Sequence, residues 1–367
     1  MAPGCPGVGS GRRNFGGRAA IRILNIMMGK GRGGLERAGI DCHEALSRAG
    51  CEVVSVIHAA SQLADAYRRA GTAIPLRSLG AWDVVAALRL RRKLRDRTFD
   101  AVVVHGNRAL YLARRLGLDA PLIAVCHTTN YNILKTLDLI DGAIVLSRHY
   151  FDVLTRAGFP ARRIREVSNS IRLGDEPGDP PDRDVPVIGG LGRLVPNKGF
   201  DVLLGALVLL KERSTAFRCV IHGVDDAGSV AAFEKMRGQL GLGAHEVAFP
   251  GWTAEPQAFL RSLDIFCLPS RREVQSIALL EALAAGRPIV CARIPGLEQV
   301  FTEGVEGIFV DIEDRVGLAD ALDALLRDRD KRLAMGRAAR RRAHDFDVDA
   351  VGGRLRAALE ELARGAA

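Results

Sequence analysis

Short runs of β-branched and other apolar residues alternate along the chain with longer segments in which apolar residues recur every three or four positions. Near-continuous apolar runs predict strands buried on both faces of a parallel sheet, and the periodic segments predict the helices that cover them. The strands expected in the first half span 21–27, 53–58, 101–105, 122–127, 143–146 and 164–167. Those expected in the second half span 186–190, 217–222, 247–249, 265–268, 288–291 and 307–310.

The strand–helix alternation occurs twice, which predicts two doubly wound α/β domains. Between them the segment RLGDEPGDPPDRDVP, residues 172–186, is too rich in Pro, Gly and Asp for a helix or a central strand, so we expect it to be the linker. The expected helices include 34–48, 84–95, 200–211, 257–262, 316–327 and 348–363. The predicted division is a flexible tail 1–20, an N-terminal domain 21–171, the linker 172–186, a C-terminal domain 187–340 and a helical tail 341–367, which could pack on either domain.

The composition of the chain limits the classes of partner that we expect for it. The chain has 367 residues, 48% of them hydrophobic, which excludes disorder of the whole chain. The 52 Lys and Arg against 43 Asp and Glu give a net charge of +9, which favours nucleic acid, an anionic membrane or a phosphate-bearing ligand. The seven cysteines form no CxxC pair and read as buried thiols of a reducing compartment. With neither a membrane-length apolar run nor an apolar signal region, we expect a cytoplasmic protein.

In each domain, a glycine-rich turn follows the first expected strand. In the first, Gly33 and Gly34 precede a helix whose free N–H groups could meet an anion, although the spacing is not GxGxxG and a plain flexible turn fits equally. In the second, Arg193 and Lys198 stand five positions apart in GRLVPNKG. Both cations could converge on one diphosphate beside a helix N-terminus, or could simply be solvated.

A third motif, EVQSIALLE, follows the expected strand 265–268. Ser276 is a plausible N-cap for the helix that follows, which places Glu273 in the loop and Glu281 inside the helix, eight positions later. A carboxylate on this otherwise apolar helix is costly without hydrogen-bond donors, and ribose hydroxyls would supply them. A solvent-facing glutamate unrelated to Glu273 is the alternative.

The stretch 89–97, RLRRKLRDR, carries six basic residues and one acid, with Leu88, Leu90 and Leu94 on an apolar side. Such a basic amphipathic helix would suit the anionic inner face of a cell membrane, while a solvated helix face would have the same sequence. No RNA- or DNA-binding motif accompanies the charge, so we expect no nucleic-acid partner.

Together these motifs resemble glycosyltransferase family 4, a family of retaining, metal-independent enzymes with the twin-Rossmann GT-B fold. The resemblance covers about residues 21–349. It rests on GGLER at 33–37, GRLVPNKG at 192–199, the Glu273–Glu281 spacing followed by LAAGRPIV at 283–290, IDGAIVLS at 140–147 and CARIPGLEQV at 291–300. It implies two α/β domains that face each other across a cleft, and transfer of a sugar from a nucleoside diphosphate.

The resemblance also assigns roles. Arg193 and Lys198 would neutralise the diphosphate leaving group, Glu281 would accept from the ribose hydroxyls, and Glu273 would bind hydroxyls of the donor sugar. Backbone N–H groups of the segment Val274, Gln275, Ser276, Ile277 and Ala278 would contact sugar and phosphate. Gly33 and Gly34 would line the N-terminal wall. His127 matches a histidine that contacts the donor sugar beside the reacting carbon, although a locally packed strand-end histidine is the alternative, and His105 has a similar placement with less support.

The sequence departs from the family pattern in places. Relatives often have Gly-Phe-Gly where this chain has Val274-Gln275-Ser276. The motif therefore does not determine which sugar the donor carries. The resemblance implies a retaining reaction with neither metal nor other cofactor, and a glycan or lipid-linked acceptor in surface polysaccharide or lipopolysaccharide synthesis. A GT-B-fold nucleotide-sugar epimerase and a non-catalytic sugar-nucleotide-binding partner remain alternatives.

Overall fold

The computed structural model describes residues 20–78, 80, 83–127, 131–223 and 228–365, so nearly all of the predicted tail 1–20 lies outside them. The chain divides into two compact units. Unit 1 contains Met1–Leu146, Phe151–Val167 and Gly352–Ala367, and unit 2 contains Ser147–Tyr150 and Ser168–Val351.

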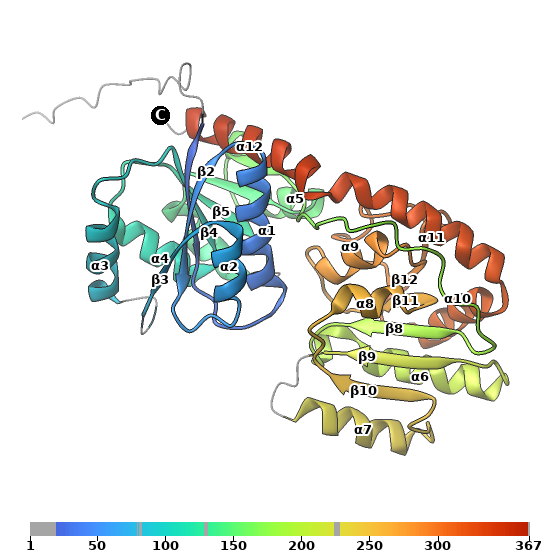
Figure 1. The fold of residues 1–367 in the computed structure, drawn as a ribbon. Coiled ribbons are helices and arrows are strands. Elements are labelled where there is room, and N and C mark those ends of the chain that lie inside the picture. Colours follow the sequence, from blue (N-terminus) through green and yellow to red (C-terminus); the bar gives the residue numbers. More distant parts are fainter. Residues whose placement is uncertain (1–19, 79, 81–82, 128–130, 224–227, 366–367) are drawn as a thin grey trace, which may run out of the picture. The chain divides into compact units, whose positions relative to one another are not determined.

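Unit 1 is built on a parallel sheet of seven strands in the order β3-β2-β1-β4-β5-β6-β7 (Figure 1). Its helices include α1 and α2, which pack together, and α3 and α4, which pack together elsewhere on the unit. The strands are β1 Arg22–Met27, β2 Glu52–His58, β3 Thr72–Leu76, β4 Ala101–His105, β5 Leu122–Cys126, β6 Gly142–Val145 and β7 Ile164–Glu166. The helices before unit 2 are α1 Gly34–Arg48, α2 Ala64–Ala70, α3 Val84–Leu94, α4 Asn107–Leu116, α5 Arg148–Arg156 and the 3-10 segments η1 Tyr131–Leu139 and η2 Ala161–Arg163.

Unit 2 repeats the plan with six parallel strands in the order β10-β9-β8-β11-β12-β13. The strands are β8 Val187–Leu191, β9 Arg218–His222, β10 Val247–Gly251, β11 Ile265–Leu268, β12 Ile289–Ala292 and β13 Gly307–Val310. The helices are η3 Pro196–Lys198, α6 Phe200–Glu212, α7 Ser229–Gln239, α8 Pro256–Arg261, α9 Ile277–Ala284, α10 Arg315–Arg327, α11 Arg329–Ala343 and η4 His344–Phe346. Helix α12, Val348–Gly365, begins in this unit and continues in unit 1.

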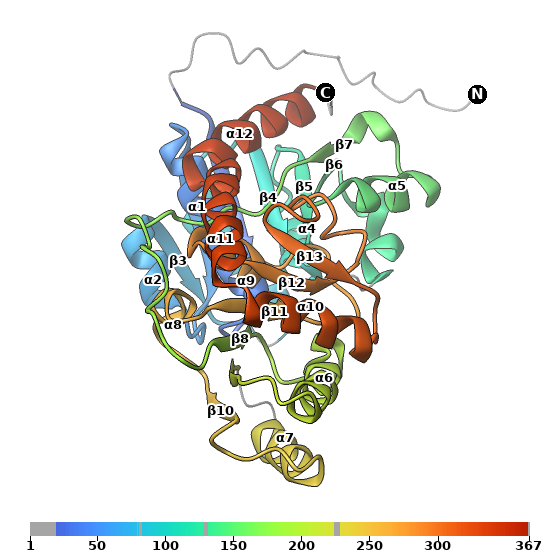
Figure 2. The same cartoon turned by 90° about the vertical axis from the view of Figure 1, so that its right-hand side faces the viewer.

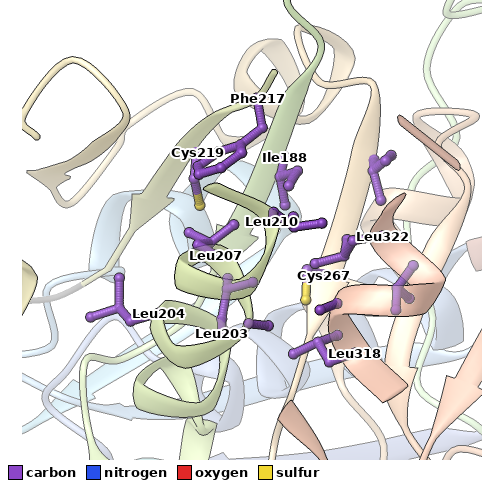
Figure 3. Close-up of a cluster of buried hydrophobic side chains, with 14 of the residues drawn as sticks. Ile188, Leu203, Leu204, Leu207, Leu210, Phe217, Cys219, Cys267, Leu318 and Leu322 are labelled. Carbon is purple, nitrogen blue, oxygen red and sulfur yellow. The ribbon is translucent and has the colours of Figure 1, made fainter. Parts of the chain in front are cut away.

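The core of unit 2 explains why its strands read as continuous apolar runs. Successive side chains of a strand point to opposite faces, and here each face is covered by helices. Ile265 and Cys267 of β11 belong to the cluster that includes residues of α6 and α10, and Figure 3 shows Cys267 there among leucines of both helices. Phe266 and Leu268 belong to a second cluster, which includes residues of α9 and α11, two helices labelled in Figure 2. Both faces of the sheet are therefore apolar, as predicted.

In both sheets the strand order reverses direction beside the first strand of the unit: β1 lies between β2 and β4, and β8 lies between β9 and β11. In open parallel sheets ligands bind at the carboxyl edge where the order reverses, because neighbouring loops there leave in opposite directions. The functional residues of each unit are thus expected in the loops after β1 and β4 and in those after β8 and β11.

Three elements differ from the sequence prediction or extend it. The prediction missed β3, a half-exposed edge strand that contains Pro75. The segment 172–186, predicted as a linker, lies within unit 2. Helix α12, which the sequence could not assign to either domain, belongs to unit 1 from Gly352 onward. The cysteines that the structure describes are all buried and unpaired with one another, as expected, whereas Cys5 lies outside the described residues.

A buried arginine fastens the segment 172–186 to unit 2. The Arg287 guanidinium is fully buried and donates to three backbone carbonyls, those of Ala285 at 2.7 Å, Leu263 at 3.1 Å and Gly178 at 3.0 Å. Burial lowers the pKa of Arg287 to about 10, which still leaves the group charged at neutral pH. Arg340, also buried, donates to the Gly174 carbonyl at 2.8 Å.

We predict that Arg287→Met lowers the free energy of unfolding by about 2 kcal/mol or more, because two buried carbonyls, those of Ala285 and Leu263, lose their donor, as does the part-buried carbonyl of Gly178. The matched control is Arg337→Met, which removes only a surface ion pair with Asp179 at 3.8 Å and should cost at most about 0.5 kcal/mol. Urea denaturation followed by circular dichroism measures both. Equal losses in the two variants would contradict this account of the segment.

Candidate functional site

Two predicted site residues of unit 2 are in direct contact. Lys198 ends η3 in the loop after β8, and Glu273 lies in the loop after β11, the neighbouring strand. The Lys198 Nζ atom lies 2.5 Å from Glu273 Oε1, and the two side chains are 18% and 12% exposed. The Ser270 hydroxyl donates to the same carboxylate oxygen at 2.9 Å. The site thus presents a cation and a carboxylate side by side at the carboxyl edge of the sheet.

A second ion pair, between Arg271 and Asp201, connects the same region of unit 2. Arg271 binds the Asp201 carboxylate with two hydrogen bonds, of 2.8 and 2.7 Å, and also bonds Glu313 at 2.7 Å and the carbonyl of Pro196. The hydrogen bonds from Arg271 hold the pKa of Asp201 below its usual value. A bidentate pair fixes orientation as well as distance, so Arg271 holds the start of α6 against the loop after β11.

Gly199 allows this close approach of the loops. It adopts a left-handed φ of +67°, and a Cβ at this position would lie 1.9 Å from the carbonyl oxygen of Pro269. A side chain here would therefore collide with backbone, not with a movable side chain. The glycine between Lys198 and Phe200 is a steric requirement of the site.

The loop 274–276 is buried and fixed. Ser276 caps α9, as predicted, with its hydroxyl accepting from Leu279 N at 3.4 Å. The Gln275 side chain accepts from the backbone N–H of Asn169 at 2.6 Å. Val274 is 4% exposed, and Gly296 is so close that a Cβ there would lie 2.2 Å from the Val274 carbonyl. The Gln275 side chain therefore ties this loop to the segment at Asn169.

The remaining predicted residues of unit 2 lie around this pair. Arg193 is exposed in the loop between β8 and η3. Glu281 is half-buried within α9, and Ile277 is the first residue of that helix. The structure thus shows Lys198 and Glu273 in direct contact, while the roles assigned to the predicted site residues stay predictions.

In unit 1, Gly33 is the N-cap of α1 and Gly34 its first residue. The Glu36 side chain folds back over the turn, since a Cβ on Gly33 would lie 3.2 Å from its carboxylate. His127 follows β5 directly and is half-buried. Its Nε2 atom lies 2.8 Å from Nδ1 of His105, and the two rings stack with centroids 5.0 Å apart.

Sequence reasoning missed the residues that position these groups. Ser270, Arg271 and Asp201 hold the two unit 2 loops together, and Asn25 of β1 bonds the His105 ring. A lone Asn inside the apolar strand RILNIM was a visible signal that a buried polar partner exists. The arginine and aspartate gave no such signal, because charged residues in loops are ordinarily solvated.

The basic helix predicted at 89–97 is only partly as expected. Leu90 and Leu94 are buried in unit 1, so they are not available to a membrane. The outer face of α3 instead carries Val84, Val85 and Leu88, each more than half exposed, in its first turns. Exposed Arg91 and Arg92 continue the same face toward the helix end.

In the part of the chain that the structure describes, no helix is both long enough and apolar enough to cross a bilayer. Within the same residues, no three His, Cys, Asp or Glu side chains are grouped so that they could hold a metal ion.

Comparison with protein families gives two matches that follow the two units. Residues 32–174 match the model described as Glycosyltransferase Family 4, and residues 177–342 match the model of Glycosyl transferases group 1. The boundary between the matches falls within the Pro-rich segment 172–186.

Similar proteins extend these matches over most of the chain. A phosphatidyl-myo-inositol mannosyltransferase of Mycobacterium leprae is 31% identical over 76% of this chain and 80% of its own length. The lipopolysaccharide core biosynthesis glycosyltransferase LpsE of Rhizobium meliloti is 30% identical over 47% of this chain and 51% of its own. The crystal structure of Anabaena Alr3699/HepE in complex with UDP and glucose superposes with a TM-score of 0.80 at 18% identity, covering 93% of this chain and 99% of that one. The predicted α/β GT-B fold is confirmed.

We predict that Gly199→Ala destabilises the protein by about 2 kcal/mol or more, because it combines an unfavourable left-handed φ with a backbone collision. Gly238→Ala is the control: this glycine lies in α7, no described atom is within 4 Å of an added Cβ, and Ala should stabilise by about 0.5 kcal/mol. Thermal denaturation separates the two variants. A Gly199→Ala protein as stable as the wild type would show that the two loops need no such close approach.

Proposed function

The chain belongs to glycosyltransferase family 4, and on that basis we propose that it moves a sugar from a nucleoside diphosphate to an acceptor hydroxyl with retention of anomeric configuration and without a metal ion. The observation that carries the donor assignment is the contact between Lys198 and Glu273 at the carboxyl edge between β8 and β11. This edge offers one cation for phosphate and one carboxylate for sugar hydroxyls. The solved structure of Alr3699/HepE with UDP and glucose supports a nucleoside diphosphate as the donor class.

Donor binding must rearrange the ion pair. In the resting structure the Glu273 carboxylate is occupied by Lys198 and Ser270. A diphosphate, with more negative charge than one carboxylate, would draw Lys198 toward itself and leave Glu273 free to accept from hydroxyls of the sugar. Arg193, exposed in the same loop as Lys198, would add a second cation, and Glu281 on α9 would accept from the ribose. The backbone of 274–278 would donate to sugar and phosphate.

The reaction proposed uses these groups to stabilise the leaving group. The bond between the anomeric carbon and the diphosphate oxygen breaks while the acceptor oxygen bonds the same face of the carbon, which retains the configuration. The acceptor proton passes to the departing phosphate oxygen, so no protein nucleophile is needed. Lys198 and Arg193 neutralise the charge that develops on that phosphate, the role that a metal ion would otherwise have. His127, from unit 1, would contact the donor sugar.

For the acceptor we propose a glycan or a lipid-linked molecule of the cell surface. One similar protein, of M. leprae, is named a phosphatidyl-myo-inositol mannosyltransferase, and another, LpsE, is named for lipopolysaccharide core biosynthesis. The outer face of α3 supports peripheral contact with an anionic membrane, since it places three exposed apolar side chains next to exposed arginines. The protein would then act in the cytoplasm, at the inner face of the membrane.

We predict that mass spectrometry of a panel of sugar nucleotides, incubated with the enzyme in EDTA, shows turnover of a nucleoside-diphosphate sugar. Lys198→Ala should lower kcat/KM at least about 100-fold, as loss of a charge-stabilising group does. Lys211→Ala is the matched control, because Lys211 of α6 also pairs with a glutamate, Glu246, at 2.8 Å, but at the far end of the helix. No turnover of any donor, or activity only with an added metal, would overturn the proposal.

We predict that the protein co-sediments with vesicles containing anionic phosphatidylglycerol and much less with neutral phosphatidylcholine vesicles. The double change Arg91→Glu with Arg92→Glu should weaken binding at least about tenfold, at about 1 kcal/mol per basic residue. The control pair is Arg68→Glu with Arg69→Glu, exposed on α2 of the same unit. If both pairs weaken binding equally, α3 is not the contact surface.

A further inference from the structure

A continuous chain of hydrogen bonds crosses the inside of unit 1 and ends at His127. We call it the histidine chain; it consists of His43, Ser55, Asn25, His105 and His127. Its first four members are between 0% and 2% exposed. Its links are His43 Nδ1 to Ser55 Oγ at 2.8 Å, Asn25 Nδ2 to Ser55 Oγ at 3.0 Å, Asn25 Oδ1 to His105 Nε2 at 2.7 Å and His105 Nδ1 to His127 Nε2 at 2.8 Å.

A backbone carbonyl sets the direction of the chain. Asn25 Nδ2 lies 3.0 Å from the carbonyl oxygen of Gly39, which can only accept a hydrogen bond. The amide nitrogen must therefore face Gly39 and Ser55, and the amide oxygen must face His105. The reverse orientation would place two oxygens against each other in a buried site, at a cost of at least one lost hydrogen bond.

This orientation determines which nitrogen of His105 is protonated. Because the Asn25 oxygen only accepts, His105 Nε2 must carry a proton and donate it. Burial, with a smaller contribution from His127, holds the pKa of His105 well below its ordinary value, so the ring carries one proton only. Its Nδ1 atom is consequently bare and can only accept.

The protonation of His105 in turn determines which nitrogen of His127 is protonated. The bare Nδ1 of His105 requires a donor, so His127 Nε2 carries the proton. Burial lowers the pKa of His127 to about 4, and the ring is neutral at physiological pH. The other end of the chain agrees with this direction, since His43 Nε2 lies 3.2 Å from the carbonyl of Ala70 and must donate to it, which leaves its Nδ1 to accept from the Ser55 hydroxyl.

We propose that Asn25 and His105 are positioning residues that fix the His127 ring in its neutral, Nε2-protonated form, so that Nδ1 of His127 is offered to the substrate as a hydrogen-bond acceptor only. Among the described residues Nδ1 has no hydrogen-bond partner, and the ring is half-buried directly after β5. The importance of this for turnover rests on the proposed function, in which His127 contacts the donor sugar.

A nitrogen that can only accept a hydrogen bond discriminates between ligand groups that donate and those that only accept. It can bind a hydroxyl group of a sugar, which donates, but it offers no proton to a phosphate oxygen, which only accepts. The chain therefore assigns His127 to the sugar and not to the diphosphate. Fixing the ring through a buried amide also removes the rotation that a strand-end histidine would otherwise have, so the ring needs no reorientation when the donor binds.

The direct test is long-range ¹H–¹⁵N correlation of the imidazole rings in the full-length protein labelled with ¹⁵N-histidine. The spectra of the wild type, without any substrate, should show protonated Nε2 and bare Nδ1 for both His105 and His127. A proton on Nδ1 of His105 would overturn the proposal, because it reverses the direction of the chain. This measurement does not depend on what the enzyme transfers.

A pair of variants tests whether Asn25 controls the tautomer of His127 through His105. Asn25→Leu keeps the shape of the side chain and removes the acceptor for His105, so the tautomer of His127, two links away, should become mixed. With the donor found by screening, kcat/KM should fall about 10- to 100-fold, the range for partners that orient a functional histidine. Tyr67→Phe is the control, a buried polar change in the same unit outside the chain, whose hydroxyl has no partner among the described residues.

The outcomes separate the two claims. If Asn25→Leu leaves the His127 tautomer unchanged in a folded protein, the positioning role is wrong whatever the activity. If the tautomer changes and kcat/KM does not, the chain orients His127 as proposed, but His127 does not contact the reacting sugar. Should Asn25→Leu fail to fold, the wild-type spectrum still decides the direction of the chain.

Discussion

The loops after β8 and β11 meet because these strands are neighbours in a parallel sheet, and the donor site proposed for unit 2 depends on that contact. It brings Lys198 within 2.5 Å of Glu273, although 75 positions separate them. Such an approach is possible only because Gly199 has no side chain to strike the carbonyl of Pro269. Arg271 then holds the two loops together from the side through its bidentate bond to Asp201. A cation and a carboxylate are thereby held side by side at this edge of the sheet.

Much of this arrangement could be predicted from sequence, because the apolar runs and glycine turns are local signals. The helix 34–48 was predicted with the bounds that the structure has, and Ser276 was recognised as the cap of α9. The edge strand β3 was not predicted because Pro75 interrupts a half-exposed run. Such strands bury few apolar side chains, so their sequence shows no clear apolar pattern. The inward face of α3 was misjudged for a related reason: leucines that suit a membrane equally suit a protein core, and only the tertiary structure shows that Leu90 is buried.

The polar interior of unit 1 marks the other limit of sequence reasoning. Asn25 and His105 are 80 positions apart, and no spacing rule connects them. What the sequence does show is that polar residues such as Asn25 and Ser55 stand in strands that are otherwise apolar. Because a buried polar group without partners is costly, these side chains had to find hydrogen-bond partners in the interior. Their identity, and the tautomers that follow from it, required the register of β1 with its neighbours.

We propose that the Lys198–Glu273 contact marks a site for a nucleoside diphosphate. Calorimetric titration of the protein in EDTA with UDP, GDP and ADP, and with the monophosphate of each base, tests this most directly. The account predicts that one diphosphate binds with a stoichiometry of about one, and at least about tenfold more tightly than its monophosphate, because the cations of the loop after β8 act on the second phosphate. Binding of none of the diphosphates, or equal affinity for the diphosphate and monophosphate of the same base, would contradict it.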